Sequence, residues 1–361
     1  MSAAPRVARL LILAPNWLGD VVMALPSIAS LRQWLPDAHL AVAARASVAP
    51  LLSLVDGVND VVPLKGRGGW RGLIDGGVDA RTLAEGQYDA AVLLPNSFHA
   101  ALLTRRARIA ERWGYATDLR RPLLTRTVAR PRGSAHQAEY YLALVTGLGA
   151  PPAPLVASVR PDRASDLRAL ALLASGGWRE GPIAVFAPGA AYGTAKQWPP
   201  SRVGDTAARL ARDAGLTPVI VGASADGSTA AEVSAAYARH ATPGVPLIDL
   251  TGKTDLSALV AVLARASVVV SNDSGAMHIA AAVGVPVAAI FGPTDERRTA
   301  PLPHPSMHRP AILVGEAWCR PCLLRTCPID HRCMTSIGVD RVVAEARRLL
   351  GPGTPAPREA A

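Results

Sequence analysis

The chain of 361 residues is poor in aromatic side chains, in lysine and in uninterrupted apolar segments. Aromatic residues make up 4% of it, and no run of five or more like charges occurs. Because nucleic-acid-binding surfaces combine basic stripes with aromatic platforms, nucleic acid is not an expected partner. The longest apolar stretches, 258–270 and 276–291, are interrupted by Arg265 and His278, so neither reaches the ~18 uninterrupted apolar residues of a membrane-spanning helix.

The apolar core of the N-terminal segment is shorter than that of a secretion signal. That core, LLILA, falls below the usual ~7–15 residues, and the polar residues Asn16 and Asp20 follow it closely. We therefore expect a buried first strand and a cytoplasmic protein.

Cysteine is also scarce, and its four copies fall in one stretch with the spacing C-x2-C-x4-C-x5-C. They are Cys319, Cys322, Cys327 and Cys333. A secreted protein held together by disulfides normally spreads its cysteines along the chain, which argues against that class. The pattern leaves three alternatives open: a structural zinc or iron–sulfur site, a reversible disulfide, or plain reduced thiols.

What the chain does have is positive charge and apolar residues. The formal net charge is +10, from 38 basic against 28 acidic residues, and half of the residues are hydrophobic. The composition is that of a globular protein. The charge favours acidic partners, namely an anionic membrane surface or phosphorylated substrates. Only Lys65, Lys196 and Lys253 are lysines, which draws attention to each of them.

Short apolar runs alternate with longer amphipathic ones along most of the chain, which predicts parallel sheets covered by helices on both faces. The expected strands are VARLLILAP, HLAVAAR, DVVPL, YDAAVLLPN and RIAERWGY in the first half, and IAVFAPG, TPVIVGAS, PLIDLTG, ASVVVSND and PVAAIFGP in the second. The expected helices include 20–35, 97–106, 199–214, 228–240, 255–265 and 275–283.

A proline-rich stretch at 149–165 separates the two halves and is a predicted linker. We expect an α/β fold with two doubly wound domains, residues 1–160 and 166–350, and a disordered tail at 351–361. Loops at the carboxyl ends of the strands are expected to line a central cleft. Residues 64–81, rich in glycine and arginine, are predicted to be a mobile loop, either a plain surface insertion or a wall that closes over an acidic substrate.

The segment NDSGAMHIAAAVG, which begins at Asn272, carries a polar loop into a helix. Asp273 and Ser274 are residue types that cap helices, and Gly275 and Ala276 allow a ligand to approach the backbone. The first turn of such a helix suits a phosphate. The alternative is an ordinary capped helix with nothing bound, and His278 is more typical of a satisfied, partly buried imidazole than of a catalytic one.

A second loop of the same half, FAPGAAYGTAKQWP, follows a strand that ends at Pro188 and Gly189. Lys196 lies there, just before a predicted helix. The spacing is not that of a Walker P-loop. Lys196 could contact a diphosphate from the side opposite the helix start.

In the first half, the loop after the first strand carries Asn16 and then Asp20. A carboxylate at that place could cap the helix, a contribution of about 1 kcal/mol, or act as a general base. A second strand-end loop offers Asn96, Ser97 and His99 as polar candidates for the same cleft.

Five segments in series resemble one known family. They are LILAPNWLGDVVMALPSI, YDAAVLLPNSFHAALL, FAPGAAYGTAKQWP, VSNDSGAMHIAAAVGVPVAAIFGPTD and CRPCLLRTCPIDHRCM, within residues 8–350. Together they resemble the heptosyltransferases of glycosyltransferase family 9, and the PNSF and AKQWP blocks favour its type II members over type I. The resemblance implies a GT-B fold of two Rossmann-like domains, with the acceptor on the N-terminal domain and the nucleotide sugar on the C-terminal one.

The resemblance also implies an activity. It is the inverting transfer of L-glycero-D-manno-heptose from ADP-heptose to the first heptose of the lipopolysaccharide inner core. The acceptor is an acidic glycolipid, so peripheral contact with the inner face of the inner membrane is expected. No metal and no cofactor is expected, and the cysteine run, absent from some relatives, should not be needed for catalysis.

Matching positions imply the roles of individual residues. Asp20 would be the general base and Lys196 would contact the donor diphosphate. The expected donor-binding residues are Gly189, Lys196, Asp273, Ser274, Gly275, Ala276, Met277 and His278. The expected acceptor-binding residues are Asn16, Asn96 and Ser97. The alternatives are a type I enzyme, another GT-B glycosyltransferase, a UDP-sugar epimerase, and a non-enzymatic nucleotide-binding scaffold.

Overall fold

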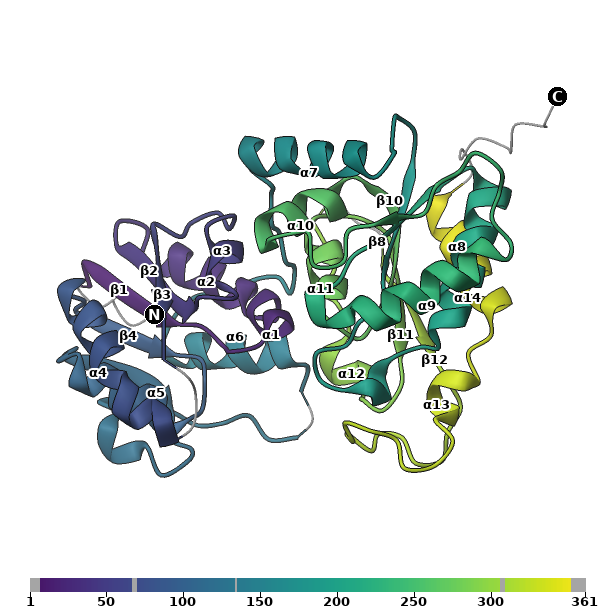
Figure 1. Ribbon diagram of the computed structural model, residues 1–361. Helices are drawn as coiled ribbons and strands as arrows, with labels where there is room; N and C mark the ends of the chain where they lie inside the picture. The colour runs from purple at the N-terminus through teal and green to yellow at the C-terminus, as the bar shows by residue number, and fades with distance from the viewer. Residues whose placement is uncertain (1–6, 67–69, 134, 306–308, 352–361) are drawn as a thin grey trace. The chain divides into compact units, whose positions relative to one another are not determined.

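The computed structural model describes residues 7–66, 70–133, 135–305 and 309–351, with all their side chains except those of 70–76. The chain divides into two compact units, Met1–Ala157 and Ser158–Ala361, each built around one parallel sheet (Figure 1). The division falls inside the proline-rich stretch 149–165. No helix of the described residues is long and apolar enough to cross a membrane.

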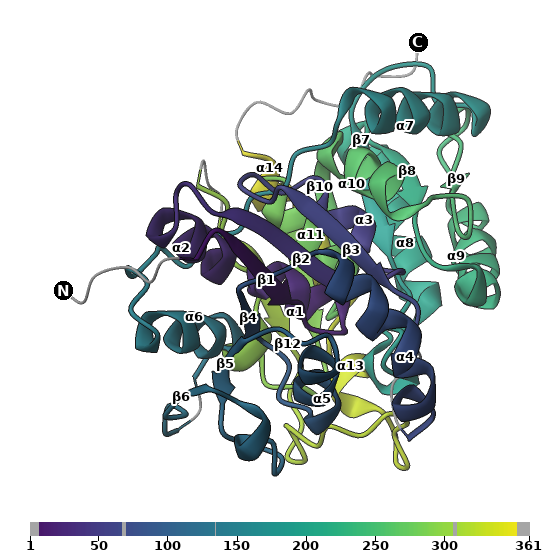
Figure 2. The ribbon, with the colours of Figure 1, turned by 90° about the vertical axis from the view of Figure 1, so that its left-hand side faces the viewer.

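The first unit contains a six-stranded parallel sheet in the order β3-β2-β1-β4-β5-β6. Its strands are β1 Arg9–Leu13, β2 His39–Arg45, β3 Asp60–Leu64, β4 Ala90–Leu93, β5 Glu111–Tyr115 and β6 Arg126–Val128. Its helices are α1 Leu18–Met23, α2 Leu25–Trp34, α3 Ala49–Leu52, α4 Trp70–Glu85, α5 Phe98–Arg106 and α6 Gln137–Gly147. Figure 2 shows α2 and α6 on one side of this sheet and α4 and α5 on the other, which is why the central strands are apolar throughout.

The second unit has a sheet of the same topology, in the order β12-β11-β10-β7-β8-β9. Its strands are β7 Ile183–Ala187, β8 Thr217–Ile220, β9 Ile248–Asp249, β10 Ala266–Asn272, β11 Val287–Phe291 and β12 Ala311–Val314. Its helices are α7 Arg163–Ser175, α8 Pro200–Ala214, α9 Gly227–Ala238, α10 Leu256–Ala264, α11 Gly275–Ala282, α12 Glu296–Thr299, α13 Arg332–Thr335 and α14 Val339–Leu350. Helices α7, α10 and α11 lie on one side of the sheet, and α8, α9 and α14 on the other (Figure 1).

The α/β prediction and the ten expected strands are confirmed. The strand order of both sheets has the same consequence for ligand binding. In each, the strand order reverses between the first and fourth strands, β1 and β4 in the first unit and β7 and β10 in the second. Loops that leave two adjacent parallel strands in opposite directions open a crevice at their carboxyl ends, where ligands of such sheets bind.

Two expectations about helices need correction. The predicted helix 20–35 is two helices, α1 and α2, because Pro26 lies at the start of α2, lacks an N–H donor and clashes with a preceding turn. The predicted loop 64–81 is wrong over most of its length, since α4 begins at Trp70. Its last turns bury Ala80 and Leu83 in the core of the unit, and this packing outweighs the cost of the helix glycines.

Several elements escaped prediction. They are β6, β12, α6, α7 and α14. The two strands are short, whereas α14 is a regular amphipathic helix of 12 residues that was missed despite its pattern. Residues 67–69 of the predicted loop and 352–361 of the predicted tail lie outside the described residues.

Candidate functional site

The reversal point of the second sheet brings the two predicted donor loops together. One loop follows β7 and carries Lys196, and the other follows β10 and carries Asp273. The Lys196 Nζ donates to Asp273 Oδ2 at 2.6 Å, and both side chains are largely buried, with 14% and 5% of their surface exposed. Two residues 77 positions apart in the sequence thus form one ion pair at the place where such a fold binds ligands.

A buried amide holds these two loops in register. Asn272, the last residue of β10, accepts the Trp198 backbone N–H at 3.1 Å on Oδ1 and donates from Nδ2 to the Pro188 carbonyl at 2.6 Å. Trp198 is itself fully buried, and its indole N–H donates to the Ile337 carbonyl. One side chain therefore fixes both ends of the loop that carries Lys196.

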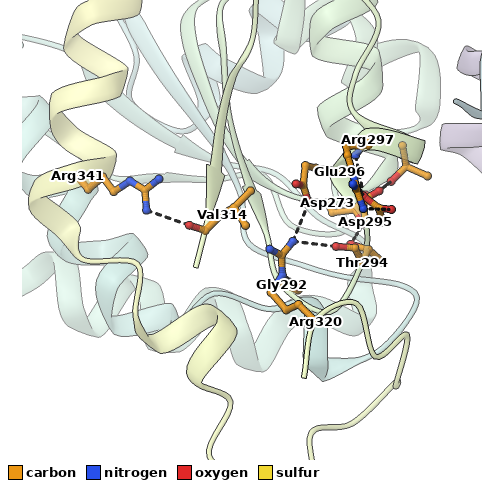
Figure 3. A network of polar contacts seen from close by, with 10 residues as sticks. Asp273, Gly292, Thr294, Asp295, Glu296, Arg297, Val314, Arg320 and Arg341 are labelled. Carbon is orange, nitrogen blue, oxygen red and sulfur yellow. Dashed lines mark hydrogen bonds and ion pairs between the residues drawn. The ribbon is translucent and has the colours of Figure 1, made fainter. Parts of the chain in front are cut away.

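Asp273 is held from a third loop as well, the one after β11 (Figure 3). The hydroxyl of Thr294 donates to Asp273 Oδ2 at 2.7 Å. Arg320 in turn donates to the carbonyls of Gly292 and Thr294 and to Glu296, the last two at 2.9 Å. The carboxylate is thus oriented by two donors, and the loop that supplies one of them is braced by an arginine.

The start of α11 lies directly after Asp273. Ser274 occupies the N-cap position in extended backbone geometry and, within the described chain, its side chain makes no cap hydrogen bond. Gly275 and Ala276 form the first turn, whose N–H groups have no partner inside a helix and carry its positive dipole end. This end of α11 can therefore accept a phosphate. Met277 and His278, one step further, are buried in the unit.

Gly189 has a structural reason to be glycine. A Cβ at this position would overlap the carboxylate of Asp226, which accepts the Ala223 N–H at 2.9 Å. The absence of a side chain lets the loop after β7 pass close to the one after β8.

In the first unit, the loops after β1 to β4 surround a cavity of about 470 Å³. Its lining residues are Leu13, Ala14, Asn16, Ala44, Arg45, Leu64, Gly66, Asp79, Pro95, Ser97, His99, Ala100 and Leu103. Two of the three predicted acceptor-binding residues, Asn16 and Ser97, are among them, as is His99, a polar candidate for the same cleft. Asn96 and the predicted base Asp20 are not among them. Such a volume suits a sugar-sized ligand.

Asn96 faces inward. Its amide donates to the Tyr140 hydroxyl at 2.8 Å and accepts from Arg120 at 3.4 Å. The guanidinium of Arg120, fully buried, also donates to the Tyr115 carbonyl, so these groups fix the strand ends. Ser97 combines two positions, because it lines the cavity and accepts the Ala100 N–H at 3.2 Å as the cap of α5.

Asp20 is the third residue of α1, and the N-cap position belongs to Trp17. The Tyr141 hydroxyl, on α6, donates to Asp20 Oδ1 at 3.3 Å. Burial, together with the nearby Asp20 charge, raises the pKa of Tyr141, which therefore stays protonated and remains a donor. Tyr141 lies 121 positions from Asp20, so the sequence gives no sign of this contact. The sequence likewise did not identify Thr294 or Arg320 as site residues.

The four cysteines are free thiols and line a cavity of about 20 Å³ together with Ala195 and His331. Burial, and then the charges of the other three thiols, raise the pKa of Cys333. Within the described residues, no three His, Cys, Asp or Glu side chains are placed to hold a metal ion.

Comparison with known proteins places this geometry in context. Residues 79–332 match the model of glycosyltransferase family 9 (heptosyltransferase). The chain is 32% identical to lipopolysaccharide heptosyltransferase 2 of Escherichia coli over 82% of its length and 86% of that protein. It is 30% identical to lipooligosaccharide heptosyltransferase 2 of Haemophilus ducreyi over 95% and 99% of the two chains. The solved structure of E. coli ADP-heptose lps heptosyltransferase II superposes with a TM-score of 0.77 and 28% identity, over 95% and 98% of the chains.

Proposed function

Since the chain belongs to glycosyltransferase family 9, we propose that it transfers L-glycero-D-manno-heptose from ADP-heptose to the first heptose of the lipopolysaccharide inner core. The observation that carries the donor half of this proposal is the buried Lys196–Asp273 pair beside the start of α11. A nucleoside diphosphate is the ligand that a cation and a helix N-terminus at a strand-order reversal suit best. The choice of sugar and acceptor rests on the likeness to the type 2 relatives, which extends over most of each chain.

The chemistry follows from the two charged centres. Asp20 takes the proton of an acceptor-heptose hydroxyl, whose oxygen then attacks the anomeric carbon from the face opposite ADP. The bond from that carbon to the diphosphate breaks, and its electron pair leaves with ADP. Lys196 and the first-turn amides of α11 stabilise the charge that grows on the diphosphate. Tyr141, which donates to Asp20, orients the carboxylate.

On the acceptor side, Asn16 and Ser97 line the 470 Å³ cavity at the carboxyl ends of the first sheet, together with Arg45. We propose that this cavity takes the heptose of the acceptor, with Arg45 facing its acidic groups. Because the acceptor is a glycolipid and the chain carries a net charge of +10, we also propose peripheral attachment to the inner face of the inner membrane.

The test is ADP release from ADP-heptose in the presence of EDTA, with acceptors that carry either no heptose or one. Release only with the one-heptose acceptor is expected. Release with the heptose-free acceptor would make the protein a type I enzyme instead. Consumption of donor without any acceptor would indicate an epimerase. Binding of ADP without turnover on either acceptor would contradict the proposed transfer and would mean that the donor carries a different sugar.

A further inference from the structure

The charges at the donor site do not balance for the ligand proposed above. A diphosphate brings negative charge, yet the ammonium of Lys196 is already paired with the carboxylate of Asp273 at 2.6 Å. The pair as a whole is neutral. The start of α11 adds about half a positive charge. A site that attracts a diphosphate from water therefore needs another cation close to Lys196.

The structure contains a cation, Arg325, that shares an aromatic neighbour with Lys196. The ring of Tyr192 lies in the same loop as Lys196, and its centroid is 4.9 Å from Lys196 Nζ and 5.4 Å from the guanidinium carbon of Arg325. Both cations thus lie within cation–π distance of a single ring. Arg325 is exposed, and among the described residues no carboxylate pairs with it, so its charge is available to a ligand.

Arg325 belongs to the cysteine-bearing segment, residues 318–333, and that segment is tied to the loop of Lys196. The Arg325 carbonyl accepts the Ala195 N–H at 2.9 Å, one residue before Lys196. The Ala195 carbonyl lies 2.7 Å from His331 Nε2, and the Tyr192 hydroxyl donates to the Leu323 carbonyl at 2.6 Å.

Gly193 completes this junction. Its φ of +153° is in the range that favours glycine, and a Cβ there would clash with the backbone of Arg325. The two segments touch backbone to backbone, although Arg325 and Lys196 are far apart in the sequence. The position of the Arg325 Cα relative to Lys196 is therefore set by main-chain contacts, while its side chain is free to turn from the Tyr192 ring to a ligand.

We propose that Arg325 is a second diphosphate-binding cation of the donor site, held on the face of Tyr192 until the donor arrives. A guanidinium can bind two phosphate oxygens at once, which Lys196 cannot do. This inference rests on the proposed function, because it assumes that the site takes a nucleoside diphosphate. It also gives the cysteine-bearing segment a part in donor binding that does not require thiol chemistry.

The experiment is calorimetric titration of the full chain with ADP and, separately, with adenosine. For Arg325→Gln we expect ADP affinity about tenfold weaker and adenosine affinity unchanged, because only the diphosphate contact is lost. Arg332→Gln is the matched control. Its guanidinium lies in the same segment but pairs with Asp330 at 2.7 Å, so this variant should bind ADP as the wild type does.

Unchanged ADP affinity in Arg325→Gln would overturn the inference and leave the proposed function standing. An equal loss of ADP and adenosine affinity would also overturn it, since that pattern would mean a displaced loop rather than a lost phosphate contact. Failure of the wild-type protein to bind ADP would instead overturn the proposed function. Thermal melts of both variants check that the fold is intact, which the exposure of both side chains leads us to expect.

Discussion

Replacement of Asp273 by alanine tests whether the Lys196–Asp273 pair organises the second unit. The carboxylate is 5% exposed and accepts from Lys196 and Thr294, while the Lys196 side chain is 14% exposed. Removal of one partner of a buried pair costs about 3–5 kcal/mol, because the other charge is left without compensation. Since Lys196 retains the Tyr192 ring as a neighbour, we expect the lower end of that range, about 3 kcal/mol.

A loss of this size is measurable by differential scanning calorimetry. For a unit of about 200 residues, 1 kcal/mol corresponds to about 2–4 °C, so the melting temperature of the second unit should fall by about 6–12 °C. The matched control is Asp330→Ala, which breaks the Asp330–Arg332 pair, about half exposed on both sides. An exposed pair contributes at most about 1 kcal/mol, so this variant should melt within about 4 °C of the wild type.

The comparison of the two variants decides the question. If Asp273→Ala has the same melting temperature as Asp330→Ala rather than a much lower one, the Lys196–Asp273 pair is not the organising contact that its burial indicates. A double variant, Lys196→Met with Asp273→Ala, then separates the pair from its surroundings. Because Lys196→Met removes the ammonium that Asp273→Ala leaves uncompensated, the double variant should be more stable than Asp273→Ala alone.

Three further outcomes are expected. Asp20→Asn should lower kcat by ~10²–10⁴ and leave ADP affinity as it is, because only the proton acceptor is lost; turnover near the wild-type rate would remove Asp20 from the role of base. Lys196→Ala should weaken ADP-heptose binding at least about tenfold, since it deletes a charge-assisted contact and leaves Asp273 facing the diphosphate. Lys253→Ala, which changes an exposed lysine of the same unit, is its control. If the two variants bind ADP-heptose equally well in a titration, the role assigned to Lys196 is contradicted. Cys333 should be alkylated by iodoacetamide more slowly at pH 8 than the other three thiols, because its raised pKa lowers the thiolate fraction. Mass spectrometry of the native protein measures this order, and a Cys333 that reacted first would refute the prediction. In the unfolded chain the four thiols should react at similar rates.

The two sheets and the positions of the donor loops could be predicted from the sequence. Apolar runs separated by amphipathic stretches report burial on both faces, and this signal survives in nearly every strand. Residues that follow such strands must emerge at the carboxyl edge of the sheet. That is why Lys196 and Asp273 could be expected near one another before any contact was known, and they do form an ion pair.

Local propensity favours the wrong structure where tertiary packing decides the outcome. The glycines near Trp70 favour a loop, but α4 forms because its last turns bury Ala80 and Leu83. The side chains that orient the catalytic candidates were hidden for a different reason. Tyr141 meets Asp20 across 121 positions, and a single long-range hydrogen bond leaves no periodic pattern in either segment.

The cysteine-bearing segment shows how long-range contacts that the sequence does not reveal can change a functional inference. Four cysteines with the spacing C-x2-C-x4-C-x5-C draw attention to sulfur chemistry. The alternatives drawn from the sequence were a metal site, a reversible disulfide or plain reduced thiols. The contacts that connect this segment to the donor site come from other groups. They include the guanidinium of Arg320, the carbonyls of Leu323 and Arg325 and the ring of His331. Backbone carbonyls have no sequence signature. If Arg325→Gln weakens ADP binding as expected, the segment contributes to donor binding through the position of a guanidinium. Replacing the three half-buried cysteines, Cys319, Cys322 and Cys327, with serine should then leave donor affinity nearly unchanged.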